Sequence, residues 1–255
     1  DFGGMPKLEE CYDPKSKAHI IAGTYPVEQD CVDEINALVT MFEKYSVEVF
    51  RPRNINGLNQ IFPRDIAFVI ADKLVVPNII KNRKEEVFAI DDLISQIPSE
   101  LILRMPAEVR VEGGDVISWN ECIFVGYSES EDFEKYTVAR TNKAGLNFLK
   151  DTFPNKKVKG FELNKSDIDP RENALHLDCC FQPIGKNMAI MYKGGFKNQS
   201  DINFLENYFG AENIIEISKE EMYDMNANVF SISEQVIISE KGFTRLNAEL
   251  RKRGF

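Results

Sequence analysis

Residues 64–78 read RDIAFVIADKLVVPN, two β-rich runs on either side of the turn residues Ala-Asp-Lys. Such runs around a turn predict a β-hairpin, and the periodicity of residues 81–97 predicts a helix after it. The same order of hairpin and helix recurs three more times, at residues 114–128 with 132–153, 177–195 with 201–210, and 227–240 with 243–255. The main prediction for the fold is therefore an internal repeat of one supersecondary unit.

The four repeats also share the type of residue with which each hairpin begins. A polar residue begins each of the four hairpins: Asp65, Asp115, Asp178 and Asn228. A single strand-like run precedes each hairpin, at residues 47–53, 100–106, 156–163 and 213–218. The unit is thus strand, loop, hairpin and helix, which predicts an α/β protein built from ββαβ repeats. The alternative is an ordinary alternation of helices and strands without a true repeat.

The two ends of the chain differ from this unit. The first expected helix, residues 27–45, has only the strand-like run 18–24 before it, and the last has no strand or hairpin after it. Because an open repeat would leave bare sheet edges, five helices with four hairpins predict a closed ring of five pseudo-symmetric units. We expect a single domain over residues 1–255 that lacks the first strand and the final strand and hairpin.

The amino-acid composition limits the classes of molecule that the protein is expected to bind. The chain has 255 residues, of which 31 are Lys or Arg and 41 are Asp or Glu, giving a net charge of −10. This surface gives no electrostatic reason to bind nucleic acid, and a small cationic ligand suits it better. No apolar run is long enough to span a membrane and the first residues do not resemble a signal peptide, so a cytoplasmic protein is expected.

The five cysteines match no zinc-binding spacing and are odd in number, which favours free thiols in a reducing compartment. They are Cys11, Cys31, Cys122, Cys179 and Cys180.

Three short motifs contain residues that could bind a substrate or take part in catalysis. The first is Phe-Pro-Arg-Asp at residues 62–65, where Asp65 stands at the edge of an apolar strand. The alternative is that Asp65 is a strand-capping carboxylate paired with Arg64.

The second motif is Val-Glu-Gly-Gly-Asp at residues 111–115. Its two glycines allow close approach of another group and bring Glu112 and Asp115 into one corner, although a simple Gly-Gly turn remains open.

The third motif is His-Leu-Asp-Cys-Cys at residues 176–180. Strand alternation would place His176, Asp178 and Cys180 on one face. A histidine beside a carboxylate is a competent proton carrier, while a satisfied core histidine is the structural alternative. His19, near the N-terminus, is the weaker candidate of the two histidines.

These three motifs, in this order and spacing, resemble the guanidino-group-modifying branch of the pentein superfamily: arginine deiminases, dimethylarginine dimethylaminohydrolases and glycine amidinotransferases. The resemblance spans nearly the whole chain and implies a pentein, or α/β propeller, fold. It implies a small guanidino substrate and no metal or cofactor, and it leaves a homo-oligomer open.

The resemblance also implies roles for particular residues. Asp65 and Asp178 would bind the guanidinium, with Arg64 and Asp115 beside them. His176 would be the general acid and base, and Glu112 would orient it or contact substrate nitrogens. Arg140 is similar to a family arginine that holds the substrate carboxylate, despite extra residues before it, and Arg83 is a weaker candidate for that role.

The family nucleophile is a cysteine in a final hairpin, and no residue of this sequence matches it. Cys179 and Cys180 are poor substitutes, because residues on one strand project in parallel and do not face each other across a substrate. The resemblance thus implies a cysteine-dependent hydrolase with a covalent amidino-cysteine intermediate. An amidinotransferase is the first alternative, and a non-catalytic pentein that binds a partner is the second.

Overall fold

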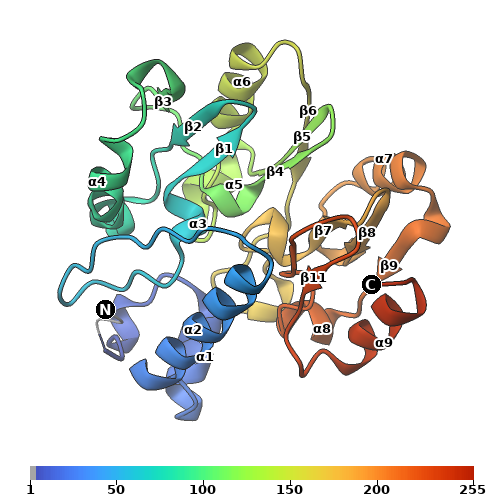
Figure 1. The fold of residues 1–255 in the computed structure, drawn as a ribbon, viewed down its shortest axis with the longest axis horizontal. Coiled ribbons are helices and arrows are strands. Elements are labelled where there is room, and N and C mark those ends of the chain that lie inside the picture. The colour runs from blue at the N-terminus through green and yellow to red at the C-terminus, as the bar shows by residue number, and fades with distance from the viewer. Residues whose placement is uncertain (1–3) are drawn as a thin grey trace. The chain divides into compact units, whose positions relative to one another are not determined.

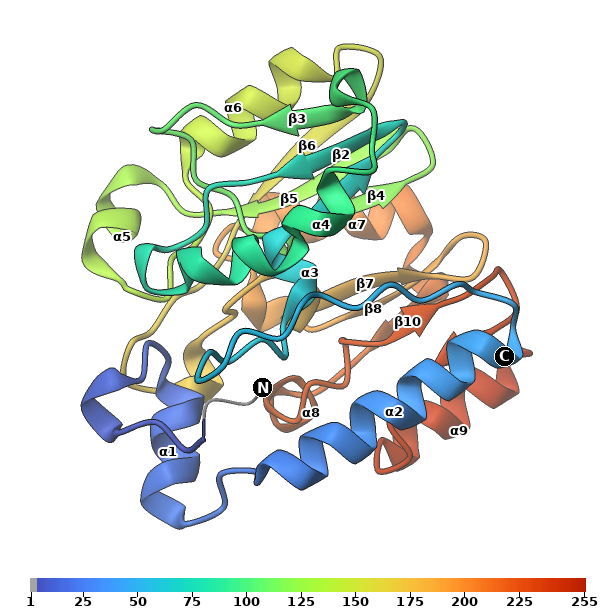
Figure 2. The same cartoon turned by 60° about the vertical axis from the view of Figure 1, so that its left-hand side comes forward.

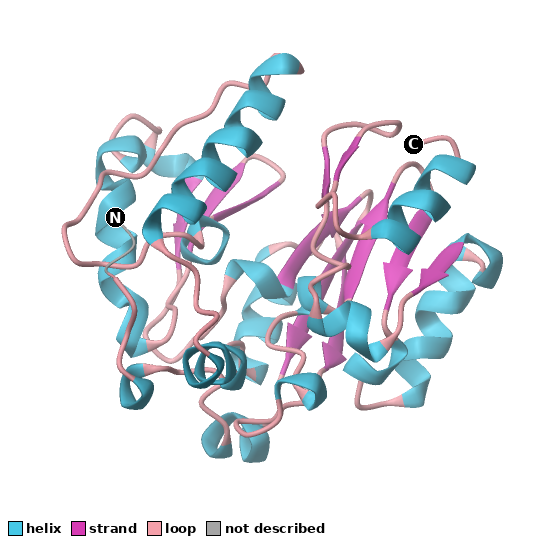
Figure 3. Cartoon of the chain, turned by 90° about the horizontal axis from the view of Figure 1, so that it is seen from below, coloured by secondary structure: helices cyan, strands magenta, loops and turns pink. Residues whose placement is uncertain are grey.

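The computed structural model describes residues 4–255, and the chain divides into two compact units between Gly113 and Gly114. Short strands connected by helices and long loops make up both units (Figure 3). None of the helices that it describes is both long and apolar enough to cross a bilayer.

The first unit contains one three-stranded sheet. The helices and strands of the unit are α1 (Pro14–Ala22), α2 (Glu28–Lys44), α3 (Pro63–Ile66), β1 (Phe68–Ile70), β2 (Lys73–Val76), α4 (Asp91–Ile94) and β3 (Ile102–Arg104). β1 pairs antiparallel with β2, and β2 pairs parallel with β3, so that Val75 lies opposite Phe68 on one side and Leu103 on the other. A small apolar core lies between α3, β2 and α4 and is formed by Ile66, Val76, Ile79, Ile90 and Ile94.

Helix α1 corrects one expectation of the sequence analysis. Residues 18–24 were expected to be strand-like, yet most of them lie in α1. Asp13 caps its N-terminus by accepting a hydrogen bond from the Ser16 N–H (2.8 Å), and Gly23 ends it in the left-handed conformation (φ 68°). These two caps decide the local structure over the short apolar run between them.

Two other expectations in this unit need correction. Residues 47–53 do not form a strand, and the helix expected over residues 81–97 is a 3₁₀-helical stretch (Lys81–Ile90) followed by the single turn α4. The long helix expected at residues 27–45 is confirmed as α2.

The second unit repeats the sheet of the first unit twice. β4 and β5 pair antiparallel and β6 pairs parallel with β5; β7 and β8 pair antiparallel and β9 pairs parallel with β8 (Figure 1). The helices and strands are β4 (Val116–Trp119), β5 (Cys122–Tyr127), α5 (Ser130–Lys135), α6 (Lys143–Thr152), β6 (Lys157–Glu162), β7 (Phe181–Ile184), β8 (Met188–Met191), α7 (Gln199–Phe209), β9 (Ile214–Glu216), α8 (Lys219–Tyr223), β10 (Phe230–Ser231), β11 (Ile237–Ile238) and α9 (Thr244–Lys252). The antiparallel pair β10–β11 precedes α9. All four predicted hairpins are therefore confirmed, as are three of the four predicted single strands, and each of these three pairs parallel with the hairpin that precedes it along the chain.

The two larger sheets of this unit share one apolar core. Phe124 on β5 contacts Phe181 on β7 edge to face, with ring centroids 5.7 Å apart, and Phe161 on β6 contacts both. Helix α6 lies against β5 and β6 (Figure 2), and α7 adds Leu205 and Phe209 to the core. This aromatic core holds the loops between the sheets in place, and those loops carry most of the candidate residues of the second unit.

Candidate functional site

In the first unit, Asp65 lies in a buried cluster of charges. The expectation that it opens a strand is wrong: Pro63 begins the short helix α3, Asp65 lies in its only turn, and β1 starts three residues later. Arg64 is exposed, and the ion pair of Asp65 is made with Arg83, whose Nη1 donates to Oδ2 at 2.7 Å. Asp65 therefore has a buried ion-pair partner 18 residues along the chain.

Arg83 is the centre of this cluster. Its Nε and Nη2 donate to the two carboxylate oxygens of Glu86 at 2.7 and 2.8 Å, and Glu112 Oε2 lies 3.5 Å from Nη1. The ring of Phe62 lies 5.7 Å from the guanidinium carbon. Three buried carboxylates therefore surround one buried guanidinium, so the cluster has an excess of negative charge when all of them are ionised.

The pKa values in the cluster follow from burial and pairing. Burial alone lowers the pKa of Arg83, but its hydrogen bonds to Glu86 and the charges of Asp65 and Glu112 raise the pKa above its usual value. Burial raises the pKa of Glu86, and Arg83 opposes that rise. The arginine thus stays charged, and the cluster can hold a planar cation by paired hydrogen bonds.

Glu112 is fully buried, and its Oε1 accepts a hydrogen bond from the Ile80 N–H at 3.1 Å. The glycine after it is needed at that place. A Cβ on Gly113 would overlap the backbone carbonyl of Arg64, so only glycine allows the two segments to approach so closely. This close approach confirms the reason given for a glycine in the motif.

In the second unit, His176 lies at the start of a tight turn. Residues Leu177–Cys179 form a 3₁₀ turn in which the Cys179 N–H donates to the His176 carbonyl at 3.2 Å, and the strand β7 begins only at Phe181. The expectation that His176, Asp178 and Cys180 share one strand face is therefore wrong. The turn does bring a ring nitrogen of His176, a carboxylate oxygen of Asp178 and the Cys179 sulfur within 4.8 Å of one another, all in buried side chains.

Asp115 is held beside this turn. Its side chain is fully buried, and Oδ1 accepts a hydrogen bond from the Leu177 N–H at 2.9 Å. Burial raises the pKa of Asp115, against the opposing effect of the His176 and Lys165 charges. Asp115 thus binds the backbone that carries His176.

The two cysteines of the turn are not placed as nucleophiles. Burial raises the pKa of both Cys179 and Cys180, and the Cys180 thiol donates to the Leu177 carbonyl at 3.5 Å. A thiol whose pKa is raised forms little thiolate near neutral pH.

Arg140 lies in a break between two helices. One helix was expected over residues 132–153, but α5 ends at Lys135 and Asn142 caps α6 by accepting from the Gly145 N–H at 2.8 Å. Asp167 fixes the intervening segment by accepting from the backbone N–H groups of residues 137 and 138 at 3.0 and 3.1 Å. Arg140 is 3% exposed, and its Nε donates to the Thr137 carbonyl at 3.2 Å.

Glu86, Lys165 and Asp167 also belong to these clusters, although none of them was expected as a site residue. Glu86 follows Arg83 by three residues, a spacing that predicts a pair on one helical face. Lys165 and Asp167 lie in a polar loop and bond to backbone groups far along the chain, so no periodicity indicates them.

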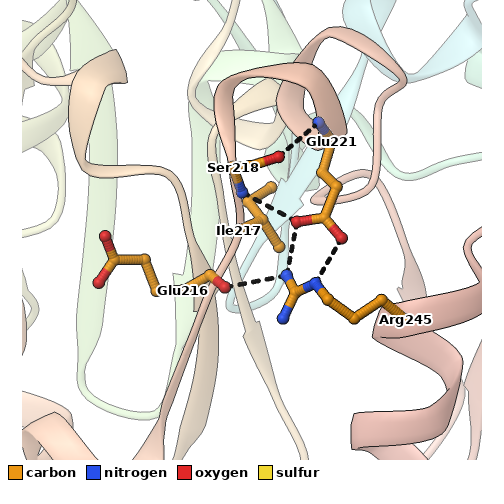
Figure 4. A pocket seen from close by; sticks show the side chains of 5 residues that line it. All are labelled: Glu216, Ile217, Ser218, Glu221 and Arg245. Carbon is orange, nitrogen blue, oxygen red and sulfur yellow. Dashed lines mark hydrogen bonds and ion pairs between the residues drawn. The ribbon is translucent and has the colours of Figure 1, made fainter.

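A pocket of the second unit lies away from all these residues. Its lining is Glu216, Ile217, Ser218, Glu221 and Arg245 (Figure 4). Arg245 Nε donates to Glu221 Oε1 at 2.6 Å, and Nη2 donates to the Glu216 carbonyl at 3.0 Å. These bonds join α9 to the start of α8, which indicates a structural role for this pair.

Comparison with known proteins identifies the family. The family model described as N,N dimethylarginine dimethylhydrolase, eukaryotic, matches residues 23–253. The uncharacterized protein YkgA of Bacillus subtilis is 29% identical over 226 residues, which cover 88% of this chain and 71% of that protein.

Solved structures show the same fold. A dimethylarginine dimethylaminohydrolase from Pseudomonas aeruginosa, solved with citrulline, has a TM-score of 0.72 at 18% identity, with 91% of this chain and 81% of that chain covered. The N-terminal domain of ArgZ, a cyanobacterial arginine dihydrolase, has a TM-score of 0.74 at 18% identity, with 90% and 78% covered. The α/β pentein fold that the resemblance implied is thereby confirmed. With the family model matching nearly its whole length, the chain belongs to the dimethylarginine dimethylaminohydrolase family of guanidino-modifying pentein enzymes, hydrolases that cleave C–N bonds of linear amidines.

Proposed function

We propose that this hydrolase acts on arginine or a substituted arginine, by a deiminase or dimethylaminohydrolase reaction that passes through a covalent amidino-cysteine intermediate. One observation carries the choice of a guanidinium as substrate. Asp65 and Glu112 are buried carboxylates in a cluster that already holds the guanidinium of Arg83 and has carboxylates in excess. Buried carboxylates of this kind attract a planar cation that can donate paired hydrogen bonds.

We assign the chemical roles as follows. Asp65 and Asp178 accept hydrogen bonds from the substrate guanidinium, and Glu112 orients His176 or contacts substrate nitrogens. His176 carries the proton, in line with the proximity of its ring to the Asp178 carboxylate. Arg140, a buried cation on a fixed segment, is proposed to bind the substrate carboxylate.

The proposed reaction has two steps. A cysteine thiolate forms a bond to the central guanidinium carbon, His176 donates a proton to the departing nitrogen, and the C–N bond breaks to release ammonia or an alkylamine. His176 then takes a proton from water as the water oxygen bonds to the same carbon. The C–S bond breaks and the remaining hydroxyl proton leaves to solvent, which gives a ureido product and the free thiolate. The burial of Cys179 and Cys180 supports a different cysteine as nucleophile, which the resemblance places in a final hairpin.

The test is turnover of the full-length protein in oxygen-18-labelled water with arginine, N-methylated arginines, agmatine and peptidyl-arginine. Hydrolysis should place labelled oxygen in the ureido group of the product. The same reactions with added glycine detect amidino transfer, because transfer makes a new guanidino compound that contains no label. A labelled ureido product supports the proposal. An unlabelled guanidino product from glycine, with no ureido product, would replace it with the amidinotransferase.

A further inference from the structure

The backbone that carries His176 lacks regular structure on its N-terminal side. Residues 173–176 belong to no helix or strand, and His176 is the residue that precedes the 3₁₀ turn. The Ala174 N–H donates to the Asn164 carbonyl at 3.0 Å, but the carbonyls of the segment belong to no strand ladder, so side chains or water must satisfy them. The position of the His176 ring therefore depends on what holds the backbone on either side of it.

Lys165 holds the segment from one side. Its Nζ donates to the carbonyls of Ala174 and Leu175, both at 2.7 Å, which are the two peptide groups next to His176. The side chain is partly exposed, while protein atoms surround its ammonium. Burial lowers the pKa of Lys165, and the charge of Asp115 opposes that effect. An ammonium in such a place is stable only where its donors are used.

Asp115 holds the other side. It accepts from the N–H of Leu177, the residue directly after His176. The Asp115 carboxylate has room there because residue 126 of β5 is a glycine. A Cβ on Gly126 would overlap Asp115 Oδ1 and lie 2.8 Å from a methyl carbon of Leu163. The sequence thus keeps a glycine at the one place in β5 where the carboxylate needs room.

We propose that Lys165 and Asp115 are positioning residues that clamp the backbone before and after His176 and so fix the direction of its ring. This inference rests on the proposed role of His176 as the proton carrier. It assigns to Asp115 a role different from substrate binding, and it gives Lys165 a role in the reaction through the backbone alone. A displacement of about 1 Å at a reacting group can slow a reaction by about 10²-fold, so the clamp matters for rate more than for binding.

The first experiment compares Lys165→Met with the unchanged full-length protein. Met has a similar length but no donors for the two carbonyls. We expect kcat to fall by about 10- to 100-fold while KM stays within about threefold, because the substrate contacts remain. Lys157→Met is the matched control, since the Lys157 side chain is 77% exposed and contacts only the surface Glu121.

The second measurement does not depend on turnover. The sequence has two histidines, and the variants His176→Ala and His19→Ala assign their signals in nitrogen-15 imidazole spectra of a protein without a histidine tag. Lys165→Met should shift, broaden or split the His176 signal and leave that of His19 unchanged. If the full-length protein hydrolyses no guanidine, the proposed function fails, while this spectrum still tests the clamp.

The Asp115 variants make the test independent of how well Lys165→Met folds. Asp115→Asn keeps an oxygen that can accept from the Leu177 N–H, and it should keep the His176 signal and most of kcat. Asp115→Ala removes that acceptor, so it should change the His176 signal and lower kcat. An unchanged His176 signal in Lys165→Met and Asp115→Ala would overturn the clamp. A changed signal with wild-type kcat would overturn its role in the reaction.

Discussion

The environment of each charged side chain decides what it can do. A ring nitrogen of His176 and a carboxylate oxygen of Asp178 lie within 4.8 Å of each other in buried side chains, and Arg83 stays charged because carboxylates surround it. Burial raises the pKa of Asp115, which accepts a hydrogen bond from the Leu177 N–H.

Asp115 gives a pH-dependent stability that can be measured. Because burial raises its pKa in the folded protein above the unfolded value, folding is favoured by protonation. The stabilising effect is present at low pH and is lost as the pH rises through the folded-state pKa. The unfolding free energy of the unchanged protein relative to Asp115→Asn should therefore increase as the pH is lowered from about 7 to about 4.5, by at most about 1.4 kcal/mol per pH unit.

Urea unfolding of both proteins over that pH range gives this difference directly. The comparison cancels the effects of titrating groups that do not interact with Asp115, because the two proteins share them. A difference that stays constant or shrinks toward low pH would show that the folded-state pKa of Asp115 is not raised.

Some site residues could be predicted from the sequence and others could not. Asp65, Glu112 and His176 stand out because acids and a histidine next to proline, glycine or apolar runs are unusual. Lys165 does not stand out, since a lysine in a polar loop is ordinary until the structure shows which carbonyls it binds. Asp115 was identified as a residue of interest, but its bond to the Leu177 N–H, 62 positions away, is visible only in the folded chain.

At the scale of elements, hairpins were the most predictable features. Alternating runs joined by turn residues fix a hairpin locally, and all four were found where expected. The turn at residues 177–179 was missed because its sequence also alternates, and a local bond from the Cys179 N–H to the His176 carbonyl decides against the strand. The break between α5 and α6 had a signal in the capping residue Asn142, which was read as part of one long helix.

The hairpin between β1 and β2 contains a strained residue. Its two-residue turn places Ala71 at φ 54°, a left-handed conformation that disfavours residues with a Cβ. Ala71→Gly should remove this strain and raise the free energy of unfolding by about 0.5–1 kcal/mol, after allowance for the greater freedom of glycine in the unfolded chain. Thermal or urea unfolding measures the change.

Ala67→Gly is the matched control for that prediction. Ala67 has an extended backbone (φ −162°), so glycine relieves nothing there and should lower the free energy of unfolding by about 0.5–1 kcal/mol. A loss of stability in Ala71→Gly equal to that in Ala67→Gly would contradict the assignment of strain to the turn.

At the scale of the whole molecule, the repeat was the most informative pattern. An antiparallel hairpin followed along the chain by a parallel third strand occurs three times, and solved pentein structures share the fold with TM-scores of 0.72 and 0.74. The family could be inferred from three short motifs because their order and spacing follow this repeat. The substrate could not be inferred, because carboxylates and a histidine suit any guanidinium and carry no information about the rest of the substrate.

The central claim is that this protein hydrolyses a guanidine with His176 as its proton carrier. The most direct measurement is the rate of ureido product formation by the full-length protein and by His176→Ala, with His19→Ala as control, on arginine and N-methylated arginines. The account predicts turnover by the unchanged protein and by His19→Ala, and a fall in kcat of at least about 10²-fold in His176→Ala, with substrate binding largely kept. Equal rates in His176→Ala and the unchanged protein, or no ureido product from any of these substrates, would contradict it.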